Sequence, residues 1–248
     1  MNRIDNFIEE FCNHKEISLK EIFDYFYSQD MTNDKSITAL LSRWTKQGIL
    51  FRVKRGVYVL TNERKKLFKL SANKTEKRLA KIFETQYPEL KYAVWNTDCL
   101  NRLMIHQHFS SFYIFETESE ILDSVFYLLK DNKMNVFMGD NLDDLQMFLY
   151  KADNPIILRK LVSRSPLVKK DKVSFPAIEK ILVDIFIDHT LFNFVQGSEL
   201  NHIYNAVFED YVVNVSKLLN YADRRKAKGE IQNYIRQTIH NPDVIALL

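Results

Sequence analysis

Three helical stripes followed at once by two short β-prone runs constrain the first sixty residues more than any other feature of the sequence. Apolar residues recur at steps of three and four from Asn2 to Asn13, again after Ser18, and a third time between Asp34 and Gly48. This spacing places the apolar side chains on one face of a helix, which can then pack on a core. We therefore expect three surface helices in this order.

The helix ends and the segment that follows them also have recognisable signals. Ser18 precedes Glu21 by three residues, which is a capping box, and Thr32–Asp34 offers a cap for the third helix. Residues 49–60 then form two β-prone runs joined by a basic turn that contains Gly56. Three helices and a hairpin are the layout of a winged helix-turn-helix, in which the third helix enters the DNA major groove.

The remaining residues alternate between helix and strand patterns and then become helical. We expect an α+β fold: an N-terminal winged helix-turn-helix domain at 1–70, and a mixed α/β domain at 75–248 that ends in a helical segment, with the boundary in the basic stretch 62–74. Pro176 suits the first position of a helix. The patterns predict helices at 75–87, 97–107, 119–132, 141–150, about 178–188, 199–210 and 214–239, and strands at 91–96, 112–116, 134–138 and 155–161.

The distribution of charge along the chain says more than the net charge of +3. Residues 1–34 carry three basic against eight acidic side chains, whereas residues 35–74 carry eleven basic side chains against Glu63 alone. The rest is nearly balanced, with 21 basic and 23 acidic side chains. A basic segment that coincides with the third helix and the hairpin indicates a site for a polyanion.

Nine side chains of this segment are suited to contact duplex DNA. With Ile37, Leu40, Leu41 and Trp44 turned inward, the third helix presents cations for phosphates and small hydroxyls for base edges. The hairpin presents cations to the phosphate backbone of the DNA. A protein-interaction module with a solvated basic rim is the alternative. The candidate DNA-binding residues are Lys35, Ser36, Thr38, Ser42, Arg43 and Lys46 on the helix, and Arg52, Lys54 and Arg55 at the hairpin.

Composition excludes several other classes of protein. Five Gly and five Pro in 248 residues leave little material for turn-rich sandwiches, propellers or Gly-rich phosphate loops. Two distant cysteines, Cys12 and Cys99, predict neither a disulfide framework nor a zinc finger, so a reducing cytoplasm fits. The acidic N-terminus is unlike a signal peptide, and Ile178 to Val195 is interrupted by four charged residues, so we expect no membrane span.

The catalytic motifs that the sequence offers are weak, so we expect neither an enzyme nor a cofactor. His106-Gln107-His108 lacks an evident third metal ligand. Gly197-Ser198 with Glu209-Asp210 faintly resembles a nucleotidyltransferase pattern, but adjacent acids on a helix point about 100° apart. Glu89-Leu90-Lys91 resembles half of a nuclease motif, although its upstream acids, Glu76 or Glu84, lie on an expected helix.

The stretch Lys-Gln-Gly-Ile-Leu-Phe-Arg-Val-Lys-Arg-Gly-Val-Tyr-Val after the third helix resembles the AbiEi-type antitoxins of bacterial type IV toxin–antitoxin systems. Tyr92 to Thr97 is similar to the start of that family's C-terminal domain, Phe175 to Asp184 to its "E+TLVDLL" helix, and Asn220 to Arg225 to its terminal helical stretch. The family's "G…ALxxHGL" segment appears here as Trp95 to His106 without its glycines.

This resemblance implies two functions. The first is repression of the protein's own operon by binding of the N-terminal domain to an operator in duplex DNA. The second is antagonism of a nucleotidyltransferase-like toxin, encoded nearby, by the C-terminal domain. The basic segment supports the first function independently of the resemblance. A one-component winged-helix transcription factor, and a DNA-directed nuclease or nucleotidyltransferase, are the alternatives.

Overall fold

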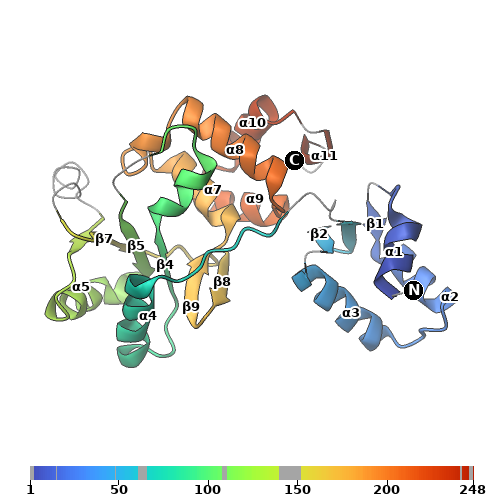
Figure 1. The fold of residues 1–248 in the computed structure, drawn as a ribbon, viewed down its shortest axis with the longest axis horizontal. Coiled ribbons are helices and arrows are strands. Elements are labelled where there is room, and N and C mark those ends of the chain that lie inside the picture. The colour runs from blue at the N-terminus through green and yellow to red at the C-terminus, as the bar shows by residue number, and fades with distance from the viewer. Residues whose placement is uncertain are drawn as a thin grey trace.

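The computed structural model of the chain describes residues 3–14, 16–47, 49–60, 66–107, 111–139, 152–240, 242–245 and 248. These residues form a smaller lobe, up to residue 60, and a larger lobe from residue 66 onward (Figure 1). Each lobe has its own apolar core. The fold mixes helices and strands and has helices at both ends of the chain, as the sequence predicts.

The three helices of the smaller lobe are those that the sequence predicts. The helices pack on one another through aromatic side chains. The centroid of the Phe7 ring lies 4.9 Å from that of Trp44 and 5.7 Å from that of Phe26. The capping box is present, since the Ser18 hydroxyl accepts a hydrogen bond from the Glu21 amide and the Glu21 carboxylate accepts one from the Ser18 amide. The helices are α1 (Arg3–Phe11), α2 (Leu19–Ser28) and α3 (Asp34–Gln47).

An antiparallel sheet closes the smaller lobe. The predicted hairpin is β2 (Leu50–Lys54) and β3 (Val57–Leu60), and a third strand, β1 (Ile17–Ser18), pairs with β3, which gives the order β1-β3-β2. The sequence did not indicate β1, because two residues are too few to show an alternating pattern. Strand β1 runs directly into α2, so the sheet and the helix meet at Ser18.

A four-stranded sheet lies at the centre of the larger lobe, and its four strands match the predicted positions. The three strands β5, β7 and β6 are parallel, and β4 is antiparallel to β5. Strand order is β4-β5-β7-β6. The strands are β4 (Tyr92–Asn96), β5 (Tyr113–Thr117), β6 (Val136–Met138) and β7 (Ile156–Lys160).

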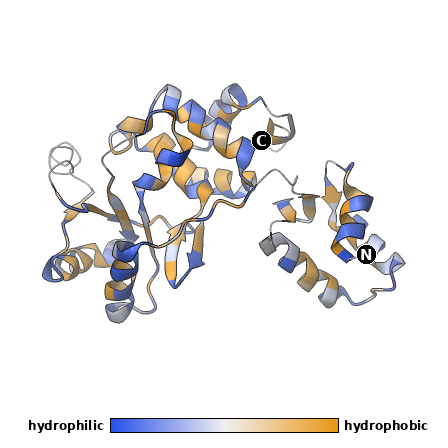
Figure 2. Ribbon diagram, in the orientation of Figure 1, coloured by the Kyte–Doolittle hydropathy of each residue, from blue (hydrophilic) through white to orange (hydrophobic). Residues whose placement is uncertain are grey.

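Helices cover both faces of this sheet. On one face α4 (Lys74–Gln86) places Phe83 against Tyr92 and Phe115, with ring centroids 5.0 and 5.3 Å apart, and α5 (Leu122–Asp131) follows alongside. On the other face lies α7 (Ile178–Ile187), in which every residue from Ile178 to Ile185 is buried. Figure 2 shows hydrophobic residues concentrated on α7 and on the strands beside it. This helix is therefore the centre of the lobe's core.

Several predicted elements differ from the structure. The predicted helix 97–107 is a shorter 3₁₀ helix, η1 (Thr97–Leu103), capped by Asn96, and the start of the helix 119–132 is a 3₁₀ turn, η2 (Ser119–Ile121). A hairpin of β8 (Leu167–Lys170) and β9 (Val173–Pro176) was not predicted, and Pro176 ends β9 instead of beginning α7. The predicted helix 141–150 lies outside the described residues.

The C-terminal part of the larger lobe is helical, as predicted. The prediction of a single helix at 214–239 is wrong. The first helix ends at Arg224, Lys226 adopts a left-handed φ of 58°, and a second helix begins at Lys228. None of the described helices combines the length and apolarity of a membrane span. The remaining elements are η3 (Asn193–Val195), α8 (Ser198–Asp210), α9 (Val215–Arg224), α10 (Lys228–Thr238) and α11 (Pro242–Ile245).

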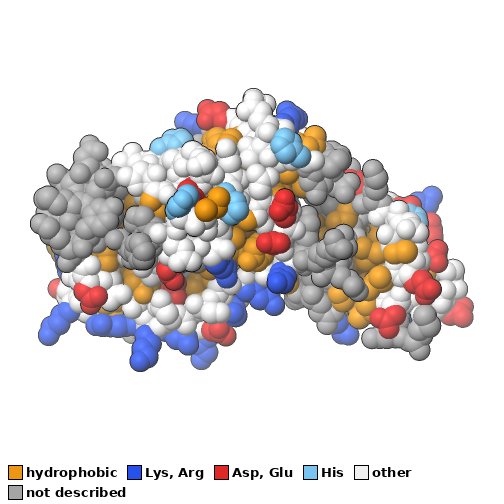
Figure 3. Space-filling view, turned by 45° about the horizontal axis from the view of Figure 1, so that its top comes forward, with side chains coloured by type: hydrophobic (Ala, Val, Ile, Leu, Met, Phe, Trp, Pro, Cys, Tyr) orange, Lys and Arg blue, Asp and Glu red, His pale blue; other side chains and the backbone are white. Residues whose placement is uncertain are grey.

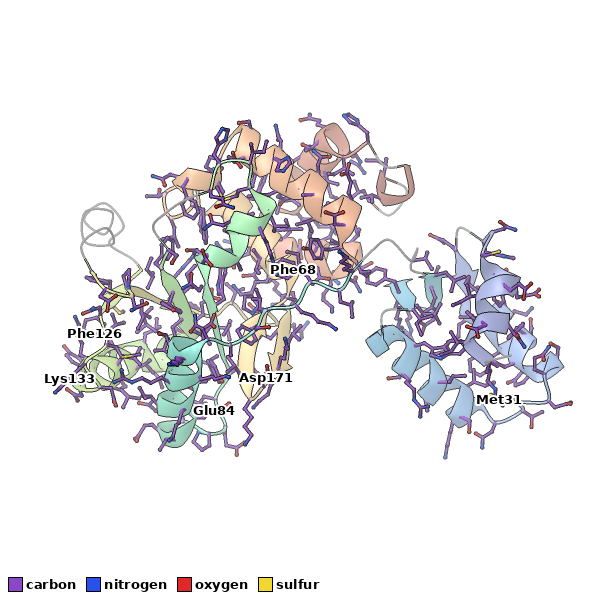
Figure 4. The ribbon with its side chains drawn as sticks, viewed as in Figure 1. Met31, Phe68, Glu84, Phe126, Lys133 and Asp171 are labelled. Atoms are coloured by element: carbon purple, nitrogen blue, oxygen red, sulfur yellow. The ribbon has the colours of Figure 1, made fainter. Side chains whose placement is uncertain are left out.

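Residues 66–73 belong to the larger lobe. Lys66 forms a parallel β-bridge with Tyr211, and the Phe68 ring lies 5.3 Å from the Tyr211 ring and 4.2 Å from the Arg102 guanidinium. Figure 4 shows Phe68 on the strand-like segment that enters the lobe. Leu70 and Ala72 pack against the same apolar core. A C-terminal fragment that keeps this core complete therefore begins at Lys66.

A chain of buried ion pairs joins the sheet to α7 and α9. Lys180 on α7 is 0% exposed, and its Nζ lies 2.9 and 2.7 Å from the two carboxylate oxygens of Glu116 on β5 and also binds Asp184. Tyr221 on α9 donates a hydrogen bond of 2.9 Å to Asp184. Arg225, just after α9, lies 3.0 Å from Asp184. We call Glu116, Lys180, Asp184, Tyr221 and Arg225 the buried charge network.

The network extends to the end of β7. Arg225 also lies 2.9 Å from Asp188, and Arg159 lies 2.7 Å from the other oxygen of Asp188. Arg159 on β7 is paired with Glu116 on β5 in the sheet, so cations and anions alternate through the network. Burial alone would lower the pKa of Lys180, but Asp184 and Glu116 hold this pKa above its ordinary value. Lys180 therefore stays charged, and its partners depend on that charge.

We predict that Lys180→Met destabilises the chain by about 3–5 kcal/mol, because buried Glu116 loses its paired cation and Asp184 loses one of its two. Lys217→Met on the exposed side of α9 is the matched control and should change stability by less than about 0.5 kcal/mol. Unfolding in denaturant, followed by circular dichroism, measures both. Equal stability of the two variants would contradict this role of the network.

Candidate nucleic-acid interface

Helix α3 has one buried face and one exposed face. Ile37, Leu41 and Trp44 are buried in the core of the smaller lobe, as the helical spacing predicts. The five predicted DNA-contacting residues whose side chains are described here all lie exposed on the opposite face. They are Lys35, Ser36, Thr38, Ser42 and Arg43. The sixth, Lys46, lies in the helix, but its side chain is outside the described residues.

The polar groups of this face are largely free. Asn33 caps the helix by accepting hydrogen bonds from the amides of Lys35 and Ser36, at 3.0 and 3.3 Å. The Thr38 hydroxyl donates to the Asp34 carbonyl at 2.8 Å, which leaves its oxygen available as an acceptor. Neither Lys35 nor Arg43 forms an ion pair with another described residue. Both charges therefore remain available to an anionic partner.

The β2–β3 hairpin lies next to α3 in the same lobe, and its turn is at Arg55 and Gly56. Gly56 has φ of 78°, and its carbonyl accepts a hydrogen bond of 2.6 Å from the Leu19 amide, so the turn is fixed against α2. Arg55 is exposed at this turn. The side chain of Lys54 lies outside the described residues.

Arg52 occupies a different position from Arg55. Its side chain is exposed, but its carbonyl accepts a hydrogen bond of 3.1 Å from the Asn214 amide group at the start of α9. Strand β2 is at the edge of its sheet, so this edge faces the larger lobe. Of the two hairpin arginines whose side chains are described, one is therefore at the tip and one is at the junction of the lobes.

The larger lobe has a second basic face that the sequence analysis did not find. It joins exposed cations of α4 with those of the β8–β9 hairpin. The two elements meet, because Lys169 lies 3.2 Å from Glu84, and Lys170 donates hydrogen bonds of 3.0 Å to the Leu70 carbonyl and to Ser71. Figure 4 shows Glu84 and Asp171 at the same end of the lobe. The exposed cations are Lys74, Lys77, Arg78, Lys81, Lys169 and Lys172.

This second face lies on the same side of the molecule as α3. In Figure 1, α3, α4 and the β8–β9 hairpin all lie along the lower side, and Figure 3 shows Lys and Arg side chains along the lower edge of the larger lobe. The acidic side chains of the smaller lobe are seen on its outer end in Figure 3. This face could not be predicted from the sequence, because α4 and the β8–β9 hairpin are far apart in the chain. The acidic side chains of the larger lobe also balance its cations in the charge count.

The residues of the catalytic motifs have structural partners. His106 is 85% exposed, and its Nδ1 lies 2.6 Å from Glu199, which also accepts the amides of Ile105 and His106. Burial would raise the pKa of Glu199, but these hydrogen bonds hold it below its usual value. No group of three His, Cys, Asp or Glu residues able to hold a metal occurs in the part of the chain that the structure describes.

The remaining acids of these motifs are also separated in the fold. Glu76 caps α4 through the Asn73 amide, and Glu84 accepts a hydrogen bond from the Tyr92 hydroxyl at 3.1 Å. Ser198 and Glu209 lie at opposite ends of α8. These residues therefore do not converge on one point.

The profile of one protein family matches residues 36–241, and it is described as a family of unknown function, DUF6577. The match begins within α3 and continues through the hairpin and the larger lobe to the end of α10. A comparison with curated proteins gave no match.

The backbone of the hairpin turn gives a test of this part of the structure. We predict that Gly56→Ala destabilises the smaller lobe by about 1 kcal/mol, because φ of 78° suits glycine and strains alanine. Gly229→Ala, in the first turn of α10 and with no neighbouring atom near its Cβ, should instead stabilise by up to about 0.5 kcal/mol. Thermal unfolding, with Trp44 fluorescence in a Trp95→Phe background, would report the first change. An unchanged midpoint for Gly56→Ala would show that the turn conformation is wrong.

Proposed function

The chain belongs to the family of unknown function DUF6577, whose profile covers well over half of its length, and we propose that it is a DNA-binding repressor that also acts as an antitoxin. The observation that carries the DNA-binding part is the exposed, unpaired basic face of α3 beside the hairpin. The smaller lobe, with three helices and a three-stranded sheet among its described residues, fits a winged helix-turn-helix.

The chemistry of the α3 face favours DNA over a protein partner. Its cations lie beside small hydroxyls on one helix, and such a helix fits the major groove of duplex DNA. Lys35 suits phosphate oxygens, whereas Arg43 can donate two hydrogen bonds to the edge of a guanine. Ser36 and Ser42 are short enough to let the helix approach the bases. A protein-interaction surface typically has a buried apolar centre within a polar rim, and this face has no exposed large apolar residue among those described.

The second basic face supports the same partner. It lies on the same side as α3, and cations on both lobes would follow the phosphate backbone of one duplex. Lys77 and Lys81 on α4 form no ion pair with another described residue. In this proposal α3 and the hairpin contact the operator, and the larger lobe adds phosphate contacts that carry no base information.

The antitoxin function rests on the resemblance to AbiEi-type antitoxins. The segment Phe175 to Asp184, which resembles that family's "E+TLVDLL" helix, contains Lys180 and Asp184 of the buried charge network. These residues hold α7 between the sheet and α9, so the resemblance lies in the framework of the larger lobe. In this proposal the larger lobe antagonises a nucleotidyltransferase-like toxin, and the smaller lobe directs repression.

The DNA-binding proposal predicts different effects of two substitutions. Arg55→Ala should weaken binding to all duplexes about equally and reduce the slope of log affinity against log salt by about 0.9, because one phosphate contact is lost. Arg43→Ala should lower the preference of the chain for its own promoter region over a random duplex. Fluorescence anisotropy at several salt concentrations measures both.

The control for this experiment is Lys228→Ala, since Lys228 is exposed at the start of α10 on the helical side of the larger lobe. It should leave affinity and salt slope unchanged. Failure of the wild-type chain to bind any duplex at low salt would reject the DNA-binding function. Equal effects of Arg43→Ala and Arg55→Ala would reject the division between base and phosphate contacts.

The antitoxin proposal predicts that protection and repression are separable. The triple variant with Arg52, Lys54 and Arg55 all changed to Ala should lose repression but protect cells from the product of the neighbouring gene, because the two functions use different lobes. Fragment 66–248, which keeps the packed segment 66–73, should protect as well. Colony survival is measured with both genes under independent promoters and at matched protein level.

Two results would contradict this proposal. Death of cells that carry the triple variant would mean that protection requires DNA binding. Normal growth with the neighbouring gene alone would mean that this gene encodes no toxin, and a one-component transcription factor would then be the better description of the chain.

A further inference from the structure

Asn214 makes hydrogen bonds to three separate parts of the molecule. Its side-chain oxygen accepts a bond of 2.8 Å from the Lys217 amide, which caps α9. Its backbone amide donates a bond of 2.9 Å to Glu179 on α7. Its side-chain nitrogen donates the bond of 3.1 Å to the Arg52 carbonyl on β2 of the smaller lobe. One residue thus connects the helical layer of the larger lobe to the hairpin.

The larger-lobe side of this connection is firmly held. Glu179 is 5% exposed and adjacent to Lys180 of the buried charge network. Helix α9 is attached to α7 through Tyr221, which donates to Asp184, and through Arg225, which binds Asp184 and Asp188. Asn214 therefore sits at the beginning of a helix whose position is set by buried ion pairs.

The smaller-lobe side of the connection is the open edge of a sheet. Among the described strands β2 pairs with β3 alone, and the Arg52 carbonyl accepts its hydrogen bond from Asn214 at the open edge. An edge carbonyl is a ready acceptor for a donor from another element. The Asn214 donor binds this carbonyl at the position where a register shift between Arg52 and Lys54 begins, just before the hairpin tip.

We infer that Asn214 is a positioning residue that sets the orientation of the smaller lobe on the larger one, so that α3 and the basic face of α4 and the β8–β9 hairpin lie along a single path for duplex DNA. The inference rests on the proposed DNA binding. The hydrogen bonds of Asn214 to Glu179 and to Arg52 hold the two lobes in one orientation whether or not DNA is bound. Held in one orientation, the two faces bind without the entropy cost of ordering two independent lobes.

The two roles of the Asn214 side chain can be separated by substitution. Asp and Ser cap helices about as well as Asn, because the cap needs only a side-chain oxygen acceptor. The Asp carboxylate has no hydrogen to donate to the Arg52 carbonyl. The Ser hydroxyl has one but is too short to reach that carbonyl. Asn214→Asp and Asn214→Ser therefore keep α9 capped and remove the link between the lobes. Asn205→Asp is the control, because among the described residues the Asn205 amide donates within α8, to the Asn201 carbonyl.

The orientation is measured first, without DNA. Cys12 is exposed on the smaller lobe, whereas burial raises the pKa of the Cys99 thiol to about 12, so Cys99 reacts slowly with a spin label. With Lys228→Cys as the second site, pulsed electron paramagnetic resonance gives the distance between the lobes. We expect one narrow distance distribution for the parent and for Asn205→Asp, and a broad one for both Asn214 variants, with unchanged thermal midpoints.

The effect on DNA is then measured with a mixed-sequence duplex long enough to reach both lobes. Both Asn214 variants should bind up to about tenfold more weakly, as expected for one lost hydrogen bond, and with a smaller salt slope. Lys77→Gln should weaken the parent, yet have less effect in the Asn214→Asp background, since the two faces no longer act together.

The outcomes distinguish the inference from the proposed function. If the parent binds DNA and the Asn214 variants keep both the narrow distance distribution and the parental salt slope, the inference is wrong and the DNA-binding proposal stands. Broad distances with unchanged binding would also overturn it, because orientation would then have no part in recognition. If the parent binds no duplex, the proposed function fails, whatever the distances show.

Discussion

The buried ammonium of Lys180 is the interaction on which the architecture of the larger lobe depends. It lies between Glu116 on the central strand β5 and Asp184 one turn later on α7, and Asp184 in turn binds Tyr221 and Arg225. A buried ion pair contributes little net stability compared with apolar packing, but removal of one partner is costly. The ion pairs of Lys180 and Asp184 instead fix the positions of α7 and α9. The charges meet only when α7 crosses the sheet at one position and α9 lies against α7.

This constraint connects the framework of the larger lobe to the proposed DNA-binding surface. The network fixes α9, the first residue before α9 contacts the edge of β2, and β2 leads to the hairpin tip. Residues 66–73 enter the larger lobe as a packed segment, so the second basic face is built against the same core. The proposed recognition surface on the smaller lobe is therefore connected, through Asn214, to the buried framework of the larger lobe.

The sequence predicts helices and their buried faces correctly where the signals are local, namely apolar periodicity and capping residues. Ile37, Leu41 and Trp44 define the buried face of α3, and the exposed residues on the other face follow from the same period. Two of the errors, the missed β8–β9 hairpin and the missed break after α9, share a different cause. The β8–β9 turn has Asp171 and Lys172 at φ of 51° and 64°, and α9 ends before Lys226 at 58°, although none of these residues is a glycine or an asparagine. Left-handed positions without glycine give no turn signal in a sequence, so the hairpin and the helix break were missed.

The candidate site was predictable only where its residues are neighbours in the chain. The α3 and hairpin cations stand within one charged segment, but the second face combines α4 with a hairpin that the sequence did not reveal. Asn214 gave no signal at all, because its role depends on a contact between two lobes.

The shared residue Ser18 has a consequence for how the smaller lobe opens. Ser18 pairs with Val57 in the sheet and caps α2 through Glu21, and the next amide, that of Leu19, binds the Gly56 carbonyl in the hairpin turn. The hairpin cannot separate from the lobe without uncapping α2, and α2 cannot fray at its start without releasing the turn. Strand and helix are thus coupled, and we expect their backbone amides to exchange with solvent through a single common opening rather than by independent local fluctuations.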